Sequence, residues 1–292
     1  MMVPAAAVKE LRQRTGAGMM DCKKALVEAK GNLEQASEFL RKAGQAKADK
    51  RASRVAAEGR IVVSSDFTVG RHVIVEVNSE TDFVAKDDNF GKFSEHIGQC
   101  ILTDIPGDIG ALMEINVNGN TLEVTRQALV TKMGENISVR RFDILESSKI
   151  VGSYVHMARI GVLIEINGGD ETLARDLAMH AAATSPHYVS TADIAEGAVN
   201  KEREILTAQA EKENKPAHIV EKIVEGRLRK YLNEITLVGQ PFVKDPDKTV
   251  GTLLSEAGAS VIRFLRYEVG EGIQKKQDDF AQEVRAQASG SL

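Results

Sequence analysis

An internal repeat constrains this chain more than any other feature of its sequence. Residues 73–78 (VIVEVN) and 162–167 (VLIEIN) are strand-like runs of β-branched and aliphatic residues. Each run follows a second strand-like run, at 61–63 and 153–155, and each precedes an amphipathic helical pattern. The chain therefore contains two copies of one hairpin-and-helix unit.

The similarity resumes further along both copies. Residues 129–134 (LVTKMG) resemble residues 253–258 (LLSEAG), and each segment leads into a further strand, at 137–145 and 261–269. The repeat therefore predicts two small antiparallel sheets with helices packed on them, which is an α+β fold.

Three short helices are predicted before the repeat. Apolar stripes at helical spacing are interrupted at residues 15–18 and at Gly31-Asn32, and the third stripe closes near Gly44. So small a bundle has a thin core and is typical of a docking unit. Residues 45–58 are polar, Ala-rich and basic, so we expect a helical or flexible linker there.

An inserted segment and a tail extend the second copy. Residues 186–232 show two helical patterns that predict an antiparallel hairpin. Because a lone helical hairpin cannot bury both apolar faces, we expect it to pack on another body or on a copy of itself. In the tail, Phe280 and Val284 mark one further short helix.

The two copies differ in the link between strand and helix. In the first copy this link runs from Ser79 to Gly91 (SETDFVAKDDNFG), whereas the corresponding link in the second copy is only Gly168 to Thr172 (GGDET). Additions to a shared architecture are where function tends to lie. The longer link is therefore the candidate functional site.

Three interpretations of this link stay open. Its carboxylates could form a cation or acid/base site, although their spacing fits no EF-hand and Lys86 lies among them. Asp82 could instead cap a helix, with Phe83 and Val84 in the core. The absence of a counterpart in the second copy favours a third interpretation, a protein contact with Phe83 as its hot spot. The cation site would use Glu80, Asp82, Asp87 and Asp88.

Composition excludes several classes of protein. A hydrophobic content of 42% can fill real cores, whereas nine Phe, four Tyr and no Trp argue against base-stacking platforms. The net charge is −4, but residues 1–54 hold twelve Lys and Arg against six Asp and Glu. We expect no direct nucleic-acid binding, and the basic segment 41–54 leaves one alternative, an RNA-binding or ribosome-associated accessory protein.

Signs of catalysis are missing from the sequence. It has no P-loop, dinucleotide-binding, zinc-protease or nucleophile-elbow motif, and its six histidines show no zinc-type spacing. Residues 15–18 could hold a phosphate at a helix start, but a turn between two helices is the favoured interpretation. We therefore expect no enzyme activity, no cofactor and no metal. Cys22 and Cys100 are expected to be reduced, buried thiols. No apolar run could span a bilayer, so we expect no membrane association and a cytoplasmic protein.

A few other side chains could contact a partner. A Met19-Met20 pair at a helix start cannot easily bury both side chains, and Met suits adaptable contact surfaces. Met133 invites the same interpretation. His156 lies in a predicted hairpin, as an exposed contact or as an ordinary loop residue.

Two long motifs resemble those of a known family. Residues 11–32 (LRQRTGAGMMDCKKALVEAKGN) and 76–88 (EVNSETDFVAKDD) are similar to the two signatures of the elongation factor Ts family, the guanine-nucleotide exchange factors for elongation factor Tu in bacterial translation. Shorter matches extend the resemblance over essentially the whole chain: GENISVRR (134–141), GSYVHMARIGVL (152–163), GQPFV (239–243) and EVGEGI (268–273).

This resemblance implies a domain organisation. The expected parts are a helical bundle like a ubiquitin-associated (UBA) domain, a core of two subdomains, a hairpin of the dimerisation type and a C-terminal helical module. Their boundaries are 1–54 for the bundle and basic linker, 55–145 for the core N-subdomain, 146–185 and 233–268 for the core C-subdomain, 186–232 for the hairpin and 269–292 for the C-terminal module.

The resemblance also implies contacts with elongation factor Tu, in its GDP-bound and nucleotide-free forms. The bundle would dock on the nucleotide-binding domain, while Asp82 and Phe83 would form a wedge beside the switch and magnesium region. Two residues depart from the expected pattern, Met133 in place of Ile and Met157 in place of Gly. The implied contact residues are Met19, Met20, Lys23, Thr81, Asp82, Phe83, Val84, Met133, Gly134 and His156.

Overall fold

The computed structural model describes residues 3–212 and 216–274. The helix predicted around Phe280 and Val284 lies outside these residues. The chain divides into two compact units: the first contains residues up to 60, residues 76–141 and the segment from 269, and the second contains residues 61–75 and 142–268. Within the described residues, none of the helices is long and apolar enough to cross a membrane.

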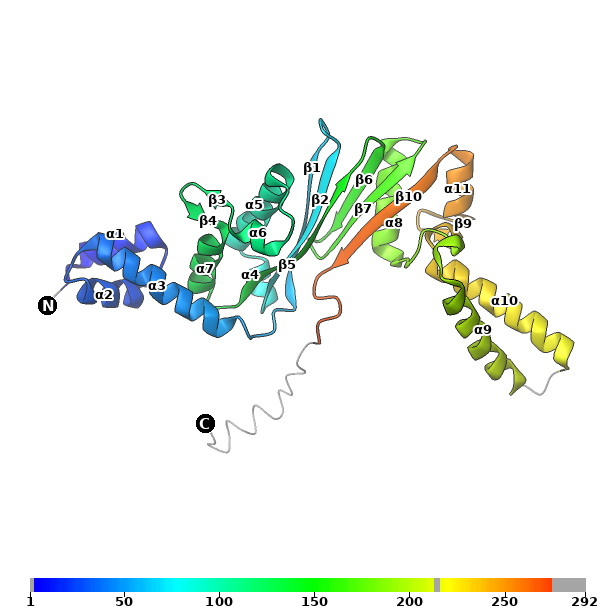
Figure 1. The fold of residues 1–292 in the computed structure, drawn as a ribbon, viewed down its shortest axis with the longest axis horizontal. Coiled ribbons are helices and arrows are strands. Elements are labelled where there is room, and N and C mark those ends of the chain that lie inside the picture. Colours follow the sequence, from blue (N-terminus) through cyan, green and yellow to red (C-terminus); the bar gives the residue numbers. More distant parts are fainter. Residues whose placement is uncertain (1–2, 213–215, 275–292) are drawn as a thin grey trace. The chain divides into compact units, whose positions relative to one another are not determined.

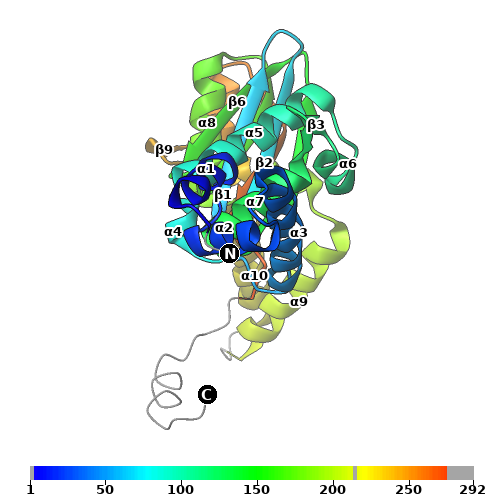
Figure 2. The same cartoon turned by 90° about the vertical axis from the view of Figure 1, so that its left-hand side faces the viewer.

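The N-terminal bundle consists of the three helices that the sequence predicts: α1 (Ala5–Thr15), α2 (Met19–Glu28) and α3 (Leu33–Arg51) (Figure 1). Figure 2 shows the same three helices from a second direction. Gly16 ends α1 in a left-handed conformation, and the Asn32 side chain caps α3 by accepting a hydrogen bond from the Gln35 N–H. The bundle's core contains Val8, Leu11, Cys22, Ala25, Leu26, Ala36 and Leu40.

The first repeat copy forms a three-stranded sheet in the order β1-β2-β5. Its strands are β1 (Glu58–Asp66), β2 (Arg71–Ser79) and β5 (Ile137–Glu146). The chain between β2 and β5 forms α4 (Asp82–Ala85), α5 (Asp88–Asp104), α6 (Ile109–Met113), a small hairpin of β3 (Asn116–Val117) and β4 (Asn120–Thr121), and α7 (Leu122–Met133).

Helix α3 continues past Gly44, where the sequence predicts its end. Gly44 is buried because α3 packs on α7 there, and a Cβ at this position would lie 3.0 Å from the Thr131 hydroxyl oxygen. This glycine therefore permits a close helix contact and does not end the helix. Lys47, in the predicted linker, pairs with Asp21 of α2 at 2.8 Å. Part of the basic segment is thus committed to the bundle.

The second copy repeats the architecture of the first. β6 (Ile150–His156) and β10 (Ser260–Glu268) lie on either side of β7 (Ile160–Asn167), both antiparallel to it (Figure 1). α8 (Glu171–Thr184) follows β7. A short hairpin of β8 (Pro241–Phe242) and β9 (Asp245–Thr249), then α11 (Val250–Glu256), precede β10 as β3, β4 and α7 precede β5. The predicted duplication and the α+β class are confirmed.

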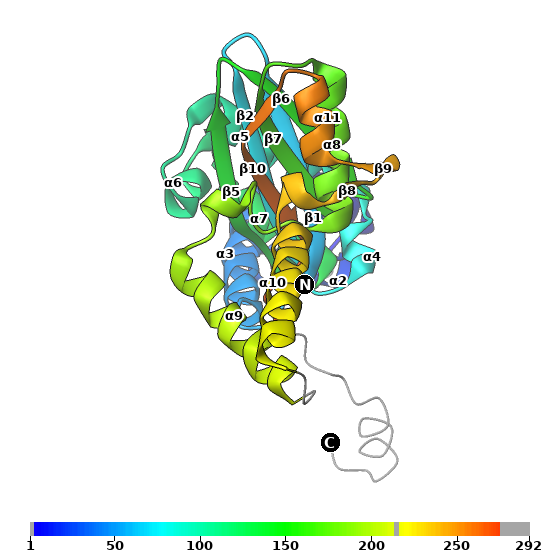
Figure 3. The same cartoon turned by 90° about the vertical axis from the view of Figure 1, so that its right-hand side faces the viewer.

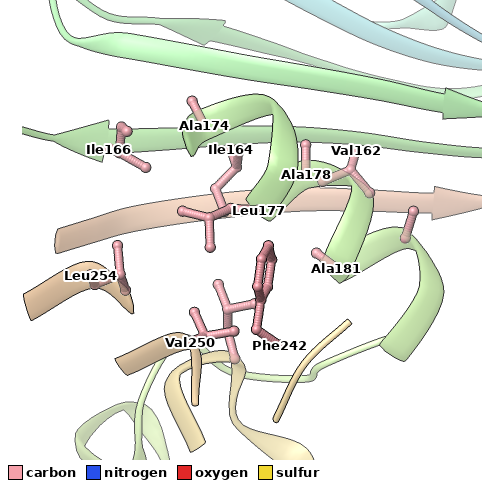
Figure 4. Close-up of a cluster of buried hydrophobic side chains, with 12 residues drawn as sticks. Val162, Ile164, Ile166, Ala174, Leu177, Ala178, Ala181, Phe242, Val250 and Leu254 are labelled. Atoms are coloured by element: carbon pink, nitrogen blue, oxygen red, sulfur yellow. The ribbon is translucent and has the colours of Figure 1, made fainter. Parts of the chain in front are cut away.

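Helix α8 packs against β6 and β7 and closes the core of the second copy (Figure 4). The close approach depends on Gly152 of β6, because a Cβ there would lie 2.3 Å from the carbonyl carbon of Ala174. The core's labelled side chains come from β7, α8 and the β8–α11 region: Val162, Ile164, Ile166, Ala174, Leu177, Ala178, Ala181, Phe242, Val250 and Leu254.

The segment inserted into the second copy forms the two expected helices. α9 (Glu196–Glu211) and α10 (Ala217–Ile235) lie side by side (Figure 3). At their base, the Leu237 N–H donates to the Tyr188 carbonyl, and the His187 N–H donates to the Ile235 carbonyl. The side chains buried between the helices are Leu206, Ala210, Val220, Val224 and Leu228.

Candidate functional site

The link after β2 is a short helix, not a free loop. Thr81 caps α4, because its hydroxyl oxygen accepts a hydrogen bond from the Val84 N–H. Val84 and Ala85 are buried, whereas the Phe83 side chain is 82% exposed. The interpretation that places both Phe83 and Val84 in the core is therefore wrong for Phe83 and correct for Val84.

Helix α8 of the second copy starts at the same distance from its strand. Asp170 caps α8 as Thr81 caps α4, and two residues separate each cap from the last asparagine of the strand motif. The first copy differs after this point, because α4 stops after four residues and α5 starts under a new cap, Asp87. What distinguishes the first copy is therefore this break and the phenylalanine at position 83, where the second copy has Thr172. Both positions are exposed, so the first copy presents an aromatic ring where the second presents a small polar side chain.

The acidic residues around Phe83 stabilise this corner. Asp82 accepts a hydrogen bond from the Lys86 ammonium at 2.6 Å and is not the helix cap. Asp87 accepts from the Asn89 side chain and from the backbone N–H groups of Asn89 and Phe90. These hydrogen bonds, chiefly that from the Asn89 side chain, lower the pKa of Asp87. In the part of the chain that the structure describes, no three His, Cys, Asp or Glu side chains gather to hold a metal ion.

Two glutamates join the start of α4 to the segment after α7. The Glu135 carboxylate accepts hydrogen bonds from the Thr81 N–H at 3.0 Å and from the Thr81 hydroxyl at 2.7 Å. The Glu80 carboxylate accepts in return from the Asn136 N–H at 2.6 Å. The structure thereby brings together two groups of predicted contact residues, those of α4 and Met133-Gly134.

Met133 and Gly134 form the C-terminal end of α7. Gly134 adopts a φ of 82°, and its N–H donates to the Val130 carbonyl at 2.9 Å. This left-handed ending is natural for glycine and strained for other residues. Met133 is half-buried at the helix end, and the chain leaves α7 at Gly134 with Glu135 as the next residue.

The predicted contacts of the bundle lie on one face of α2. Met19 and Met20 are 60% and 62% exposed, and Lys23 is exposed as well. Val27 extends the same face, because helical residues four apart lie above one another. We call these four residues the α2 stripe. It presents apolar surface with one positive charge.

His156 belongs to the second unit, at the end of β6. Its ring stacks on Tyr154 with centroids 6.1 Å apart, and the Tyr154 hydroxyl lies 3.2 Å from His156 Nδ1. The following turn holds Met157 and Ala158 at φ values of 48° and 57°, which are strained for residues that carry a side chain. Met157 is 81% exposed, so this hairpin tip presents both His156 and Met157 to solvent.

Comparison with known proteins decides the family. The family model described as "Elongation factor TS" matches residues 80–271. The chain belongs to the elongation factor Ts family. It is 56% identical to elongation factor Ts of Thioalkalivibrio sulfidiphilus and 55% identical to that of Halorhodospira halophila, over 100% of both chains in each case. Its identity to elongation factor Ts of Legionella pneumophila (strain Paris) is 50%, over 98% of each chain.

Membership of the elongation factor Ts family indicates the general function of the chain. It implies nucleotide exchange on elongation factor Tu during translation. The features gathered above suit a protein partner, since an exposed phenylalanine, an exposed apolar stripe and a strained hairpin tip all face solvent.

Sequence reasoning passed over Glu135 and Asn136. A signal for Glu135 exists in the repeat, because the residue after the left-handed glycine is Glu135 in the first copy and Ala259 in the second. Likewise, the residue before the helix cap is Glu80 in one copy and Gly169 in the other. Comparing the copies residue by residue would have marked both glutamates as additions.

Proposed function

We propose that this chain binds elongation factor Tu in its GDP-bound form, disrupts the magnesium and phosphate region and so promotes GDP release in translation elongation. The observation that carries the proposal is the exposure of Phe83 at an anchored corner of the first copy. The fold holds this apolar ring in solvent, although burying it would be favourable. Such a ring is suited to insertion between elements of a partner.

Exchange needs no covalent step, so the chain acts through differential binding. It must bind the nucleotide-free partner more tightly than the GDP-bound partner, and by linkage it weakens GDP binding by the same factor. A shift of about four decades requires about 5.5 kcal/mol of differential affinity. Burial of one Phe side chain supplies only about 1.5–3 kcal/mol. Phe83 therefore needs help from other contacts.

In this proposal the other predicted contact residues supply the rest of the differential binding free energy. The α2 stripe docks on the nucleotide-binding domain of the partner, with Met19, Met20 and Lys23 in contact. Asp82 fixes the approach of α4, whereas Thr81 and the buried Val84 contribute by holding α4 in place. Met133, Gly134 and His156 add contact surface. The partner's magnesium ion neutralises phosphate charge, so displacing it loosens GDP.

Release of fluorescent GDP from purified elongation factor Tu tests this proposal. We expect saturating amounts of this chain to accelerate release by orders of magnitude. Added GDP should weaken the complex by the factor by which the chain weakens GDP binding. Unchanged GDP release at saturation would contradict the proposal. We also propose that the chain acts in the cytoplasm, because bacterial translation takes place there.

We further propose that the hairpin within 186–232 mediates self-association. Ile205, Ile219 and Tyr231 lie on α9 and α10 and remain at least 36% exposed, so the hairpin keeps apolar surface after its own interior is filled. Sedimentation of the full chain and of Ile205→Lys tests this. A concentration-dependent dimer that the substitution dissociates supports the proposal, and a monomer at every concentration contradicts it.

A further inference from the structure

We infer that Glu135 is a positioning residue for nucleotide exchange: it holds α4 in the orientation that presents Phe83, and Glu80 completes the anchor. The inference rests on the proposed function, because it concerns how Phe83 reaches the partner. Glu135 lies outside the predicted contact set and acts through Thr81, its hydrogen-bonding partner.

Helix α4 cannot hold Phe83 in place by itself. It spans four residues, Asp82–Ala85, and isolated helices shorter than about 12 residues are marginal in water. The buried side chains of Val84 and Ala85 fix one face of α4, and the opposite face carries Phe83 into solvent. The direction of the phenyl ring therefore depends on what holds the first residue of the turn.

Glu135 holds that residue with two hydrogen bonds. One carboxylate oxygen accepts from the Thr81 N–H at 3.0 Å, and the other accepts from the Thr81 hydroxyl at 2.7 Å. The same hydroxyl oxygen accepts from the Val84 N–H, so it links the carboxylate to the helix backbone. Hydrogen bonds to a charged acceptor are stronger than those between neutral groups. Both the position and the rotation of Thr81 are thereby set.

A reciprocal contact supports this anchor from the other side. Glu80 accepts from the Asn136 N–H at 2.6 Å and lies 3.6 Å from the Arg54 guanidinium. The Asn136 side chain donates to the Arg54 carbonyl at 2.8 Å. Each of the two segments, 80–81 and 135–136, thus supplies a glutamate carboxylate that accepts from a backbone N–H of the other. Both segments also contact Arg54 in the segment that follows α3.

The second copy shows that the fold does not require this arrangement. Gly169 and Ala259 occupy the positions of Glu80 and Glu135, and a Cβ built on Gly169 would lie 3.3 Å from the Cβ of Ala259. The two positions are therefore neighbours in that copy as well, with small residues in contact. Carboxylates at this place occur in the copy that carries the exposed phenylalanine, which points to a role in presenting it.

Anchoring contributes to exchange by reducing the entropy lost when Phe83 inserts into the bound partner, a step that limits the release rate even at saturation. A loop that is already ordered in its bound conformation gives up less freedom when the partner closes around it. If α4 sampled several orientations, only the fraction with Phe83 correctly placed would be competent to insert. Glu135 raises that fraction without touching the partner.

A double-mutant cycle on Glu135 and Phe83 tests the inference. The readout is the maximal rate of fluorescent GDP release from elongation factor Tu at saturating chain, with wild type, Glu135→Ala, Phe83→Ala and the double variant. We expect Glu135→Ala to slow release by about 5- to 30-fold. In the double variant we expect no loss beyond that of Phe83→Ala, because residues that act through one another are non-additive.

Glu123→Ala is the matched control. Glu123 is also a carboxylate associated with α7, but it accepts from Arg126 and Gln127 and has no contact with α4 among the hydrogen bonds of the described residues. Its loss should leave the maximal release rate unchanged. Thermal unfolding of each variant separates folding defects from exchange defects, and Glu135→Gln replaces Glu135→Ala if the latter fails to fold.

Two variants of Thr81 supply a second, independent readout. Thr81→Ser keeps the hydroxyl and should retain most of the exchange rate, whereas Thr81→Val keeps only the N–H contact to Glu135 and should lose part of it.

The outcomes separate the inference from the proposed function. If Phe83→Ala slows release and Glu135→Ala does not, the anchoring role is wrong and the wedge survives. Full additivity of the two substitutions also overturns the anchoring role. If Phe83→Ala leaves release unchanged, the wedge itself is wrong.

Discussion

Glu76 and Glu165 occupy the same position of the central strand in the two repeat copies, and each is a buried carboxylate paired with arginine from the third strand. Glu76 accepts from Arg140 and Arg141 of β5. Glu165 accepts from Arg263 of β10 at 2.7 Å. The duplication thus extends from the strand pattern to a charged contact, which fixes the register between the central and third strands of each copy.

Glu76→Gln should destabilise the fold more than Glu165→Gln does. Glu76 is completely buried and also accepts from the Asn78 side chain and the Gly270 N–H. Although burial by itself raises the pKa of Glu76, these hydrogen bonds lower it overall. Removing one partner of a buried charge pair costs about 3–5 kcal/mol, and the partly exposed arginines reduce this to about 2–3 kcal/mol.

Urea unfolding at neutral pH measures this difference. Because the pKa of Glu76 is lower in the folded state, its contribution is complete above the unfolded value of about 4.3 and is lost as pH falls through the folded value. The wild type should therefore lose stability below about pH 4.3, and Glu76→Gln should lose less over the same range. Equal acid sensitivity in both would contradict the assignment.

His180 should make the free energy of unfolding depend on pH in a range above the acid range in which Glu76 titrates. It is fully buried on α8, Nδ1 accepts from the Val243 N–H, and Nε2 therefore carries the proton that is donated to Gln240. Burial lowers the pKa of His180, partly offset by the Gln240 hydrogen bond. The unfolded chain thus binds more protons below about pH 6.5, and stability falls as pH drops through that value.

The slope of unfolding free energy against pH between about 7.5 and about 5.5 is the test. His72 is also buried, and burial lowers its pKa too, against the opposing effect of Glu165, so His180→Gln should reduce the slope without abolishing it. An unchanged slope would show that His180 titrates alike in the folded and unfolded chain.

Two glycine-to-alanine substitutions should change stability in opposite directions. Gly152→Ala would place a Cβ 2.3 Å from the Ala174 carbonyl carbon, so α8 must move off β6, at a cost of about 2 kcal/mol or more. Gly226 lies in the exposed middle of α10, and a Cβ there would meet open space, with no neighbour within 4 Å, so Gly226→Ala should stabilise by about 0.5–1 kcal/mol. Thermal unfolding of both variants checks the signs, and two shifts in the same direction would refute this packing argument.

Charge reversal on the α2 stripe should slow association with elongation factor Tu. Lys23 is exposed on the same face as Met19 and Met20, so Lys23→Glu should lower the association rate by about 3- to 10-fold and alter its salt dependence. Lys9→Glu makes the same change of charge at an exposed residue of α1, which is not part of the stripe, and should have a smaller effect. Equal effects of the two variants would mean that only net charge matters.

Local patterns explain what could be predicted from the sequence. β-branched runs and helical spacing are properties of short segments, so both sheets, the three N-terminal helices and the inserted hairpin follow from them. Long-range partners explain what could not. Gly44 resembles a helix end until Thr131 is seen against it. Glu135 has no visible role until the fold places it beside Thr81, 54 residues away in sequence.

The corner at Phe83 combines both situations. Its exposure is consistent with the prediction of a contact residue, but the predicted loop is a capped helix followed by a break. The break depends on Asp87, which caps α5 and therefore ends α4 early. Thr81, Asp82 and Asp87 all suit a helix cap by residue type, so sequence alone could not tell that Thr81 caps α4 and Asp87 caps α5.

The most direct test of the account compares two phenylalanines of similar exposure. Phe83 is 82% exposed on α4, and Phe67 is 77% exposed in the turn between β1 and β2, so replacing either by alanine should barely change folding stability. We expect Phe83→Ala to slow stimulated GDP release from elongation factor Tu by about 10- to 150-fold, and Phe67→Ala to leave it unchanged. Full stimulation by folded Phe83→Ala would contradict the account.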